Sequence, residues 1–224
     1  MGFDTESDLR DAAQESLSQC FSTYAREAVP EFNYGSGRTD LVLVNVSEPY
    51  WTYREGKLNI REPITDDQHL ISFIHLHGRE PITIDRFFEL GAQKERYKNK
   101  ALDWLLSHNF VERTSEGKLR TAPNLRRHIT TTIAIEFKIS KWRKALQQAS
   151  KGRSFAEYKY VALDEDHLSP ALENQKLFRE DSVGLISVGS DGSCEVRLAP
   201  RRGSPYSKLY KWKLNEQSVV SVRS

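Results

Sequence analysis

The stretch TTTIAIEFKI, residues 130–139, constrains the fold most, because it has the period of a β-strand and carries two charges inside an apolar pattern. Side chains alternate between the two faces of a strand, so Glu136 and Lys138 share one face. The other face is apolar and holds Ile133, Ile135, Phe137 and Ile139. Burying a carboxylate and an ammonium costs several kcal/mol per ion unless they are paired or a metal ion compensates them. An ion pair at a strand end is the structural explanation, and a reactive or metal-binding pair is the functional one.

Segments of strand period alternate with segments of helix period along much of the chain. A capping pattern of Thr5 and Asp8, followed by apolar residues at helical spacing up to Pro30, predicts a helix over residues 6–28. Strands are predicted at 39–46 (TDLVLVNV), 129–139, 157–163, 182–188 and 193–199, helices at 140–156 and 169–179, and a hairpin-like stretch at 50–60. This alternation predicts an α/β fold.

Residues 66–123 have a different pattern, with three short helices followed by two strands around a Glu-Gly turn. That order predicts a winged helix-turn-helix subdomain, inserted into a core formed by residues 1–65 and 124–224. The third helix, KERYKNKALDWLLSHN, shows one apolar stripe. The stripe predicted to be buried comprises Tyr97, Ala101, Trp104, Leu105 and His108.

The composition is that of a folded globular protein, since 38% of the 224 residues are hydrophobic and 29% are charged. No run of about 18 apolar residues occurs, so neither a membrane span nor a membrane partner is expected. The two cysteines, Cys20 and Cys194, lack metal-ligand spacing, which predicts reduced thiols in a cytoplasmic protein. The net charge of +2 neither indicates nor excludes a nucleic-acid partner.

Four residues in a fixed order give the chain a family resemblance. Asp40 lies in a strand pattern, Glu136 and Lys138 form an E-x-K pattern in a later strand, and Gln148 lies in the helix that follows. This order resembles the PD-(D/E)XK nuclease superfamily, whose fold is a restriction endonuclease-like mixed sheet flanked by helices. Thr39 stands where the superfamily name has Pro, and about 95 residues separate Asp40 from Glu136. A compact insert explains that separation if its two ends lie close together.

The resemblance implies a Mg²⁺-dependent deoxyribonuclease, with Mn²⁺ as a substitute, acting in DNA repair or in restriction and defence. Asp40, Glu136 and the Phe137 carbonyl would hold the metal, and Lys138 would position or deprotonate the attacking water. Gln148 would contact a bound water or phosphate; alternatively it is a solvated helix residue. Glu6 would complete the metal shell; alternatively it complements the dipole of the first helix.

The inserted subdomain offers a candidate DNA surface. Arg96, Asn99 and Lys100 are predicted on the outward face of its third helix, opposite the apolar stripe. On the hairpin, the residues placed to reach phosphates are Arg113, Lys118 and Arg120. Winged helices also mediate protein contacts, and Asp103 on the outward face would repel phosphate.

The sequence therefore predicts a nuclease that binds DNA, with a homodimer as one option for its assembly. A DNA-binding regulator built on a degenerate nuclease scaffold is one alternative. An interaction module of a repair or defence assembly is another.

Overall fold

The computed structural model describes residues 2–23, 25, 27–35 and 37–223, and side chains up to residue 219. The chain divides into two compact units. The first comprises Met1–Val46 and Ile129–Ser207, and the second comprises Ser47–His128 and Lys208–Ser224. Among the described residues, no helix combines the length and the apolar character needed to cross a bilayer.

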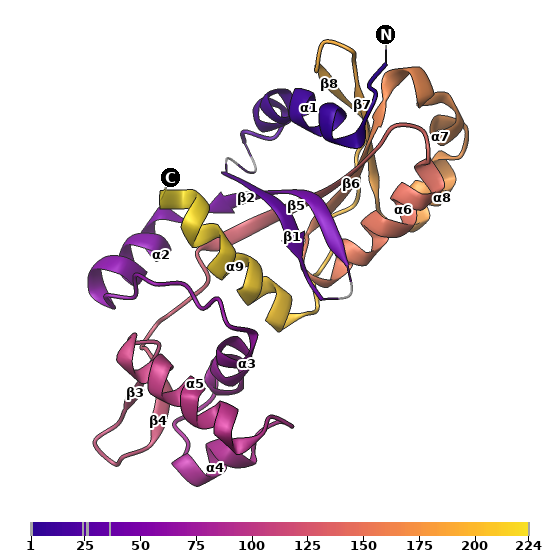
Figure 1. Cartoon of the computed structure of the whole chain (residues 1–224). Helices are drawn as coiled ribbons and strands as arrows, with labels where there is room; N and C mark the ends of the chain where they lie inside the picture. Colours follow the sequence, from indigo (N-terminus) through magenta and orange to yellow (C-terminus); the bar gives the residue numbers. More distant parts are fainter. Residues whose placement is uncertain (1, 24, 26, 36, 224) are drawn as a thin grey trace. The chain divides into compact units, whose positions relative to one another are not determined.

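The first unit is built on a mixed six-stranded sheet with strand order β1-β2-β5-β6-β7-β8 (Figure 1). Its strands are β1 (Glu27–Asn33), β2 (Arg38–Val46), β5 (Ile129–Lys138), β6 (Tyr158–Asp164), β7 (Gly184–Val188) and β8 (Cys194–Leu198). Its helices are α1 (Glu6–Cys20), α6 (Trp142–Lys151), α7 (Ser169–Glu173) and α8 (Gln175–Glu180), with short turns η2 (Gly152–Ser154) and η3 (Glu165–His167). Strands β5, β6 and β7 are parallel, and the other neighbours are antiparallel. The predicted α/β class is thereby confirmed as a mixed sheet flanked by helices.

Helices cover both faces of this sheet. Leu9, Ala13 and Leu17 of α1 are fully buried in one core cluster, together with Ile135 and Phe137 of β5. On the other face, apolar residues of α6, α7 and α8 pack over β6 and β7. The side of β5 that carries Glu136 and Lys138 is thus covered as well, and both residues are buried. Strand β5 therefore lies inside the sheet, where burying these two charges costs free energy.

The helix predicted over residues 6–28 is too long, because α1 ends at Cys20. Thr5 does cap it, since the Thr5 hydroxyl accepts a hydrogen bond from the backbone N–H of Asp8. The apolar residues Ala28 and Val29 belong instead to β1, which pairs antiparallel with β2. Pro30 is compatible with this strand because β1 lies at the edge of the sheet, where a missing N–H leaves no neighbour unpaired.

Two other predicted elements differ from the structure. The hairpin-like stretch at 50–60 folds as α2 (Glu48–Thr52), continued by one π-helical turn, η1 (Tyr53–Lys57). Its aromatic residues suit a strand, but Pro49 at the start of a turn favours a helix. The helix predicted at 169–179 is split into α7 and α8 at Asn174.

The second unit contains the predicted order of three helices and a hairpin. These elements are α3 (Asp67–Leu76), α4 (Ile84–Glu89), α5 (Glu95–Ser107), β3 (Val111–Arg113) and β4 (Leu119–Thr121). Ile82, between α3 and α4, forms an isolated bridge to Leu119 and so adds a third extended position beside the hairpin. Phe73, Leu105 and Phe110 lie in the core of this unit.

This unit is larger than the predicted insert of residues 66–123. It also contains residues 47–65 and 124–128 and a C-terminal helix that the sequence analysis did not identify, α9 (Lys208–Arg223). Trp212 of α9 is buried in the same core. Glu216 of α9 forms a buried two-fold ion pair with Arg54, at 2.7 Å for each contact. The C-terminal helix is therefore part of the second unit rather than of the sheet unit.

Candidate functional site

Asp40 and Glu136 lie directly opposite each other on neighbouring antiparallel strands. Strand β2 pairs with β5 as far as Leu41 opposite Ile135, and extending this register by one residue sets Asp40 opposite Glu136. Opposed residues in such a pair have Cα atoms about 4.5–5.5 Å apart. The Asp40 carboxylate also accepts a 2.9 Å hydrogen bond from the backbone N–H of Phe137. The fold thus brings together two acidic residues that are about 95 positions apart in the chain.

The Glu136 carboxylate is buried with little compensation for its charge. Its residue is 1% exposed, and neither side-chain oxygen has a hydrogen-bond partner among the described residues. Burial, and next the negative charge of Asp40, raise the pKa of Glu136 from 4.5 to about 8, although the Thr39 hydroxyl and then the Lys138 ammonium oppose this rise. A carboxyl group buried in this way is stabilised either by binding a proton or by a cation beside it.

From the packing of α6 on the sheet, we infer that Gln148 lies near the level of Glu136 along β5. A Cβ atom on Gly152 would lie 3.5 Å from Ala134 of β5 and 3.5 Å from Lys159 of β6, so the end of the helix packs over both strands. Gln148 is one helical turn before Gly152, about 5.4 Å, and Glu136 is two strand residues after Ala134, about 6.6 Å. Because α6 runs back along β5, both steps lead in the same direction. The Gln148 Oε1 atom is buried and has no hydrogen-bond partner in the described part of the chain.

Lys138 forms a second group of contacts at the end of β5. Its ammonium donates hydrogen bonds to Glu6 Oε2 at 2.6 Å and to the Phe137 carbonyl at 2.7 Å. Lys138 is 6% exposed, whereas the Glu6 side chain is 49% exposed. Glu6 and the Phe137 carbonyl, both predicted as metal ligands, therefore contact Lys138 in this structure.

Asp164, at the end of β6, is a residue that the sequence analysis missed. It is buried, and its carboxylate accepts hydrogen bonds from the backbone N–H groups of Phe3, at 3.1 Å, and Asp166, at 3.0 Å. Phe3 lies three residues before Glu6, so Asp164 helps to hold the start of α1 near Lys138. An acid that ends the apolar run YVALD was the available signal.

The donors at this site limit which ligand it can hold. Among the described residues, no three Asp, Glu, His or Cys side chains are grouped as a metal cage. The groups that fit a cation are the carboxylates of Asp40 and Glu136 and the unpaired oxygen of Gln148. A hard cation that keeps several of its waters, such as Mg²⁺, needs only one or two protein carboxylates. The donor set therefore fits such an ion better than Zn²⁺, which takes His and Cys ligands.

The predicted DNA-binding residues of the second unit are accessible, but some are already paired. Arg96, Asn99, Lys100, Arg113 and Arg120 are exposed, and Lys118 is half-buried. Arg120 pairs with Glu112 at 2.5 Å, and Lys118 pairs with Glu116 at 2.8 Å. These acids neutralise much of the positive charge of the hairpin.

The predicted buried stripe of α5 was wrong at Tyr97, and Trp104 and His108 are only half-buried. Tyr97 is 38% exposed and lies beneath the guanidinium of Arg96. Lys98 is buried in its place, 2% exposed, because its ammonium donates a 2.6 Å hydrogen bond to the Phe88 carbonyl. A lysine can be buried in this way when its ammonium has a polar partner at the end of its long stem.

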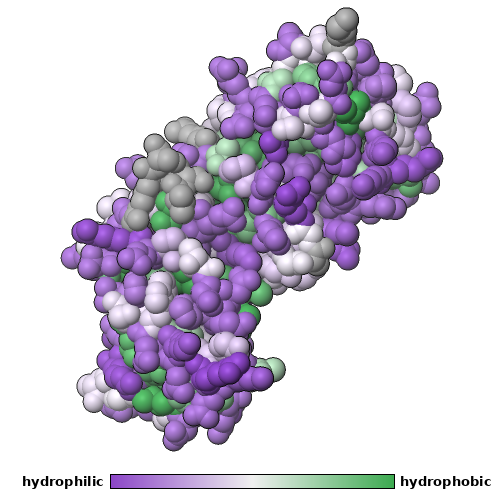
Figure 2. Space-filling view, viewed as in Figure 1, coloured by the Kyte–Doolittle hydropathy of each residue, from purple (hydrophilic) through white to green (hydrophobic). Residues whose placement is uncertain are grey.

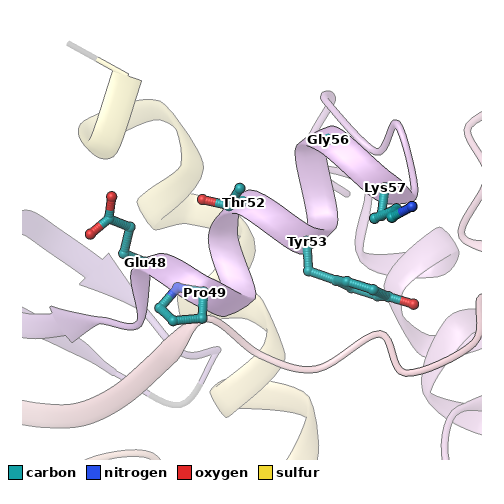
Figure 3. A pocket seen from close by; sticks show the side chains of 6 residues that line it. All are labelled: Glu48, Pro49, Thr52, Tyr53, Gly56 and Lys57. Atoms are coloured by element: carbon teal, nitrogen blue, oxygen red, sulfur yellow. The ribbon is translucent and has the colours of Figure 1, made fainter.

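A surface hollow of about 700 Å³ lies on the second unit along α2 and η1 (Figure 3). Its lining residues are Glu48, Pro49, Thr52, Tyr53, Gly56 and Lys57. The Tyr53 hydroxyl donates a 3.2 Å hydrogen bond to the Pro123 carbonyl. None of the residues predicted to act in catalysis, metal binding or DNA binding lines this hollow.

Comparisons with protein-family models, curated proteins and solved structures gave no significant match to this chain.

Proposed function

We propose that this protein is a Mg²⁺-dependent DNA nuclease with a restriction endonuclease-like core of the PD-(D/E)XK type. The observation that carries the proposal is the Asp40–Glu136 pair, in which Glu136 is buried without a hydrogen-bond partner. Lys138, two residues along the same strand, completes the D…E-x-K arrangement. The mixed sheet, with helices on both faces, is compatible with this core.

Asp40 and Glu136 would hold the Mg²⁺ ion, or Mn²⁺ in its place. When bound, the ion supplies positive charge that polarises the phosphodiester and lowers the pKa of an attacking water. Asp40 already accepts the Phe137 N–H, which fixes the orientation of its carboxylate. The Phe137 carbonyl and Glu6 join the ligand set only if the Lys138 ammonium leaves them, since it now occupies both acceptors.

Lys138 would orient the attacking water and stabilise the negative charge that develops on the phosphoryl oxygens. An ammonium has three donors, and two of them are used by Glu6 and the Phe137 carbonyl. Those two contacts hold the ammonium in place beside the site, which is the pre-organisation that electrostatic stabilisation requires. Gln148, level with Glu136, would use its free Oε1 atom to accept a hydrogen bond from a bound water.

The second unit would contribute a winged helix that contacts DNA. Its order of helices and hairpin, and the bridge from Ile82 to Leu119, support this assignment. Arg96, Asn99 and Lys100 of α5 would face the major groove. Because the hairpin residues Lys118 and Arg120 are paired with acids, we assign phosphate contact there first to Arg113.

The proposal is tested by incubating the protein with supercoiled, linear and branched DNA, and with RNA, in Mg²⁺ or Mn²⁺. We expect cutting of DNA that EDTA and Glu136→Gln abolish. The matched control is Glu173→Gln, which makes the same chemical change at an exposed position of α7 and should cut normally. Cutting that survives Glu136→Gln would contradict the proposed site. Binding of DNA without cutting would favour a DNA-binding regulator. A protein that neither binds nor cuts DNA would favour an interaction module.

A further inference from the structure

Helix α6 and the turn after it carry an unusual concentration of positive charge. Residues 139–156 contain five cations and no acid, a net charge of +5 in a chain whose total is +2. The rest of the chain therefore carries −3. All five cations are exposed, and none of them forms an ion pair within the described residues. They are Lys141, Arg143, Lys144, Lys151 and Arg153.

Three of these cations share an edge of α6 with Gln148. Lys141, Lys144, Gln148 and Lys151 are spaced by three, four and three residues, which places them on one side of a helix. The opposite edge faces α8, where Ser150 donates a 2.7 Å hydrogen bond to Asp181. We call Lys141, Lys144 and Lys151 the lysine stripe.

The lysine stripe lies beside the Asp40–Glu136 pair. The edge of α6 that carries Gln148 leads to Gly152, which packs over Ala134 of β5 and Lys159 of β6, and this packing sets Gln148 near the level of Glu136. Lys144 is one turn further toward the end of β5, and Lys151 is almost one turn in the other direction. In Figure 2 the surface over α6 is largely hydrophilic. A negatively charged chain that reaches Glu136 along this edge would meet all three ammonium groups.

The spacing of the stripe fits a polynucleotide backbone. From Lys141 to Lys151 the helix rises by about 15 Å. One strand of a duplex has a phosphate every 3.4 Å or so along the axis, so the stripe spans about four phosphates. Flexible lysine stems with compact charges suit such contacts, which position a backbone without reading its sequence.

We infer that the lysine stripe of α6 binds the phosphodiester backbone of the nucleic acid and leads it to Glu136. The assignment of this nucleic acid as the substrate rests on the proposed nuclease function, whereas the binding itself does not. Under this inference the sheet unit holds nucleic acid by its own surface, in addition to any contact made by the second unit.

The test measures binding of the full-length protein to labelled 20-mer duplex DNA, single-stranded DNA and RNA, in EDTA and over a range of salt. The stripe variant is Lys141→Gln, Lys144→Gln and Lys151→Gln. The matched variant removes the same charge at exposed positions outside the stripe, by Lys176→Gln, Arg201→Gln and Arg202→Gln.

We expect the stripe variant to lose up to about tenfold in duplex affinity per lost contact at 0.1 M salt, and its salt slope to fall by about 2 to 3. The matched variant should keep the wild-type slope, and thermal unfolding should show both variants folded. The three oligonucleotides identify which backbone binds most tightly. An unchanged slope in the stripe variant would overturn the inference, as would wild-type protein that binds none of them.

Two further outcomes separate this inference from the proposed function. If the protein binds through the stripe but cuts nothing, the nuclease proposal fails and the stripe stands. If the protein cuts DNA and the stripe variant binds and cuts as the wild type does, the stripe fails and the nuclease stands. Binding only to vesicles of phosphatidylserine and phosphatidylcholine, with no oligonucleotide bound, would assign the charge to a lipid surface and overturn the inference.

Discussion

Replacing Glu136 by Gln should stabilise the protein, and the gain should grow with pH. The pKa of Glu136 is about 8 in the folded protein and 4.5 as its ordinary value. Between these values the folded protein holds a proton that the unfolded chain has released, so the stability of the wild type falls as pH rises. Gln is nearly the same size and has no charge to bury. Glu136→Gln should therefore match the wild type near pH 4.5 and exceed it at pH 8.

The size of the effect follows from the two pKa values. At about 1.36 kcal/mol per pH unit, the interval from 4.5 to about 8 corresponds to at most about 5 kcal/mol. For a unit of this size such a gain would raise the unfolding midpoint by about 10 to 20 °C. The gain in stability should reach its full size slightly above pH 8, because Glu136 is then ionised in both the folded and the unfolded wild type.

The assay is thermal or urea unfolding of both proteins in EDTA at several pH values between 4.5 and 9. Glu173→Gln is the control, because that carboxylate is exposed and its replacement should change stability by less than about 0.5 kcal/mol at every pH. A gain that is equal at pH 5 and pH 8 would refute the assignment of the effect to ionisation. A variant that is less stable than the wild type at pH 8 would show that Glu136 is structurally compensated.

Three further results are expected. Mg²⁺ at a concentration 100 times its Kd should stabilise the wild type by about 2.7 kcal/mol in thermal unfolding, and it should not stabilise Glu136→Gln. Equal stabilisation of both proteins would mean that the ion binds elsewhere. Lys138→Met should lower the rate of DNA cutting by about 10²- to 10⁴-fold while DNA binding in EDTA persists, and parallel losses of both would assign Lys138 to binding. Arg54→Met should destabilise the second unit by about 3–5 kcal/mol, because Glu216 is then buried without its partner. In urea unfolding, the double variant Arg54→Met and Glu216→Leu should regain stability relative to Arg54→Met. No gain in the double variant would mean that loss of the ion pair is not the cause.

Five of the six strands of the sheet were predictable because their patterns are local. Residues 129–138 show the alternation of a strand, and the run from Leu41 to Val44 is apolar enough to be covered on both faces, as the structure confirms. Strand β1 was missed because Ala28 continues the helical spacing of α1 and Pro30 then resembles a helix stop. The edge position that permits Pro30 is a property of the sheet, which no local pattern contains.

Helix α9 was missed for a related reason. Its buried residues include Glu216, a charged residue that periodicity assigns to the surface. Glu216 is buried because Arg54, about 160 residues away in the chain, supplies two hydrogen bonds, and the N–H of Ile64 supplies a third. Burial of an ion depends on its partners, and these partners come from distant segments.

The candidate site was predictable in its residue types and only partly in its contacts. The E-x-K pattern fixed Glu136 and Lys138 on one strand face, because strand geometry alone does so. The strand pattern did not predict that the Glu136 and Lys138 side chains have different neighbours. The register that sets Asp40 opposite Glu136, and the return of α1 that brings Glu6 to Lys138, arise from tertiary packing.

The contacts of Lys138 explain why Glu136 is difficult to interpret as a structural residue. A lysine two residues away on the same face is the nearest candidate to neutralise Glu136, yet its ammonium donates to Glu6 and to the Phe137 carbonyl. Asp40, directly opposite, makes the burial of Glu136 more costly rather than less. An apolar residue such as Val would fit this covered position and remove the cost. A destabilising acid kept in the sheet, with a second acid next to it, is what we expect where a function requires those oxygens, and this favours the proposed metal site.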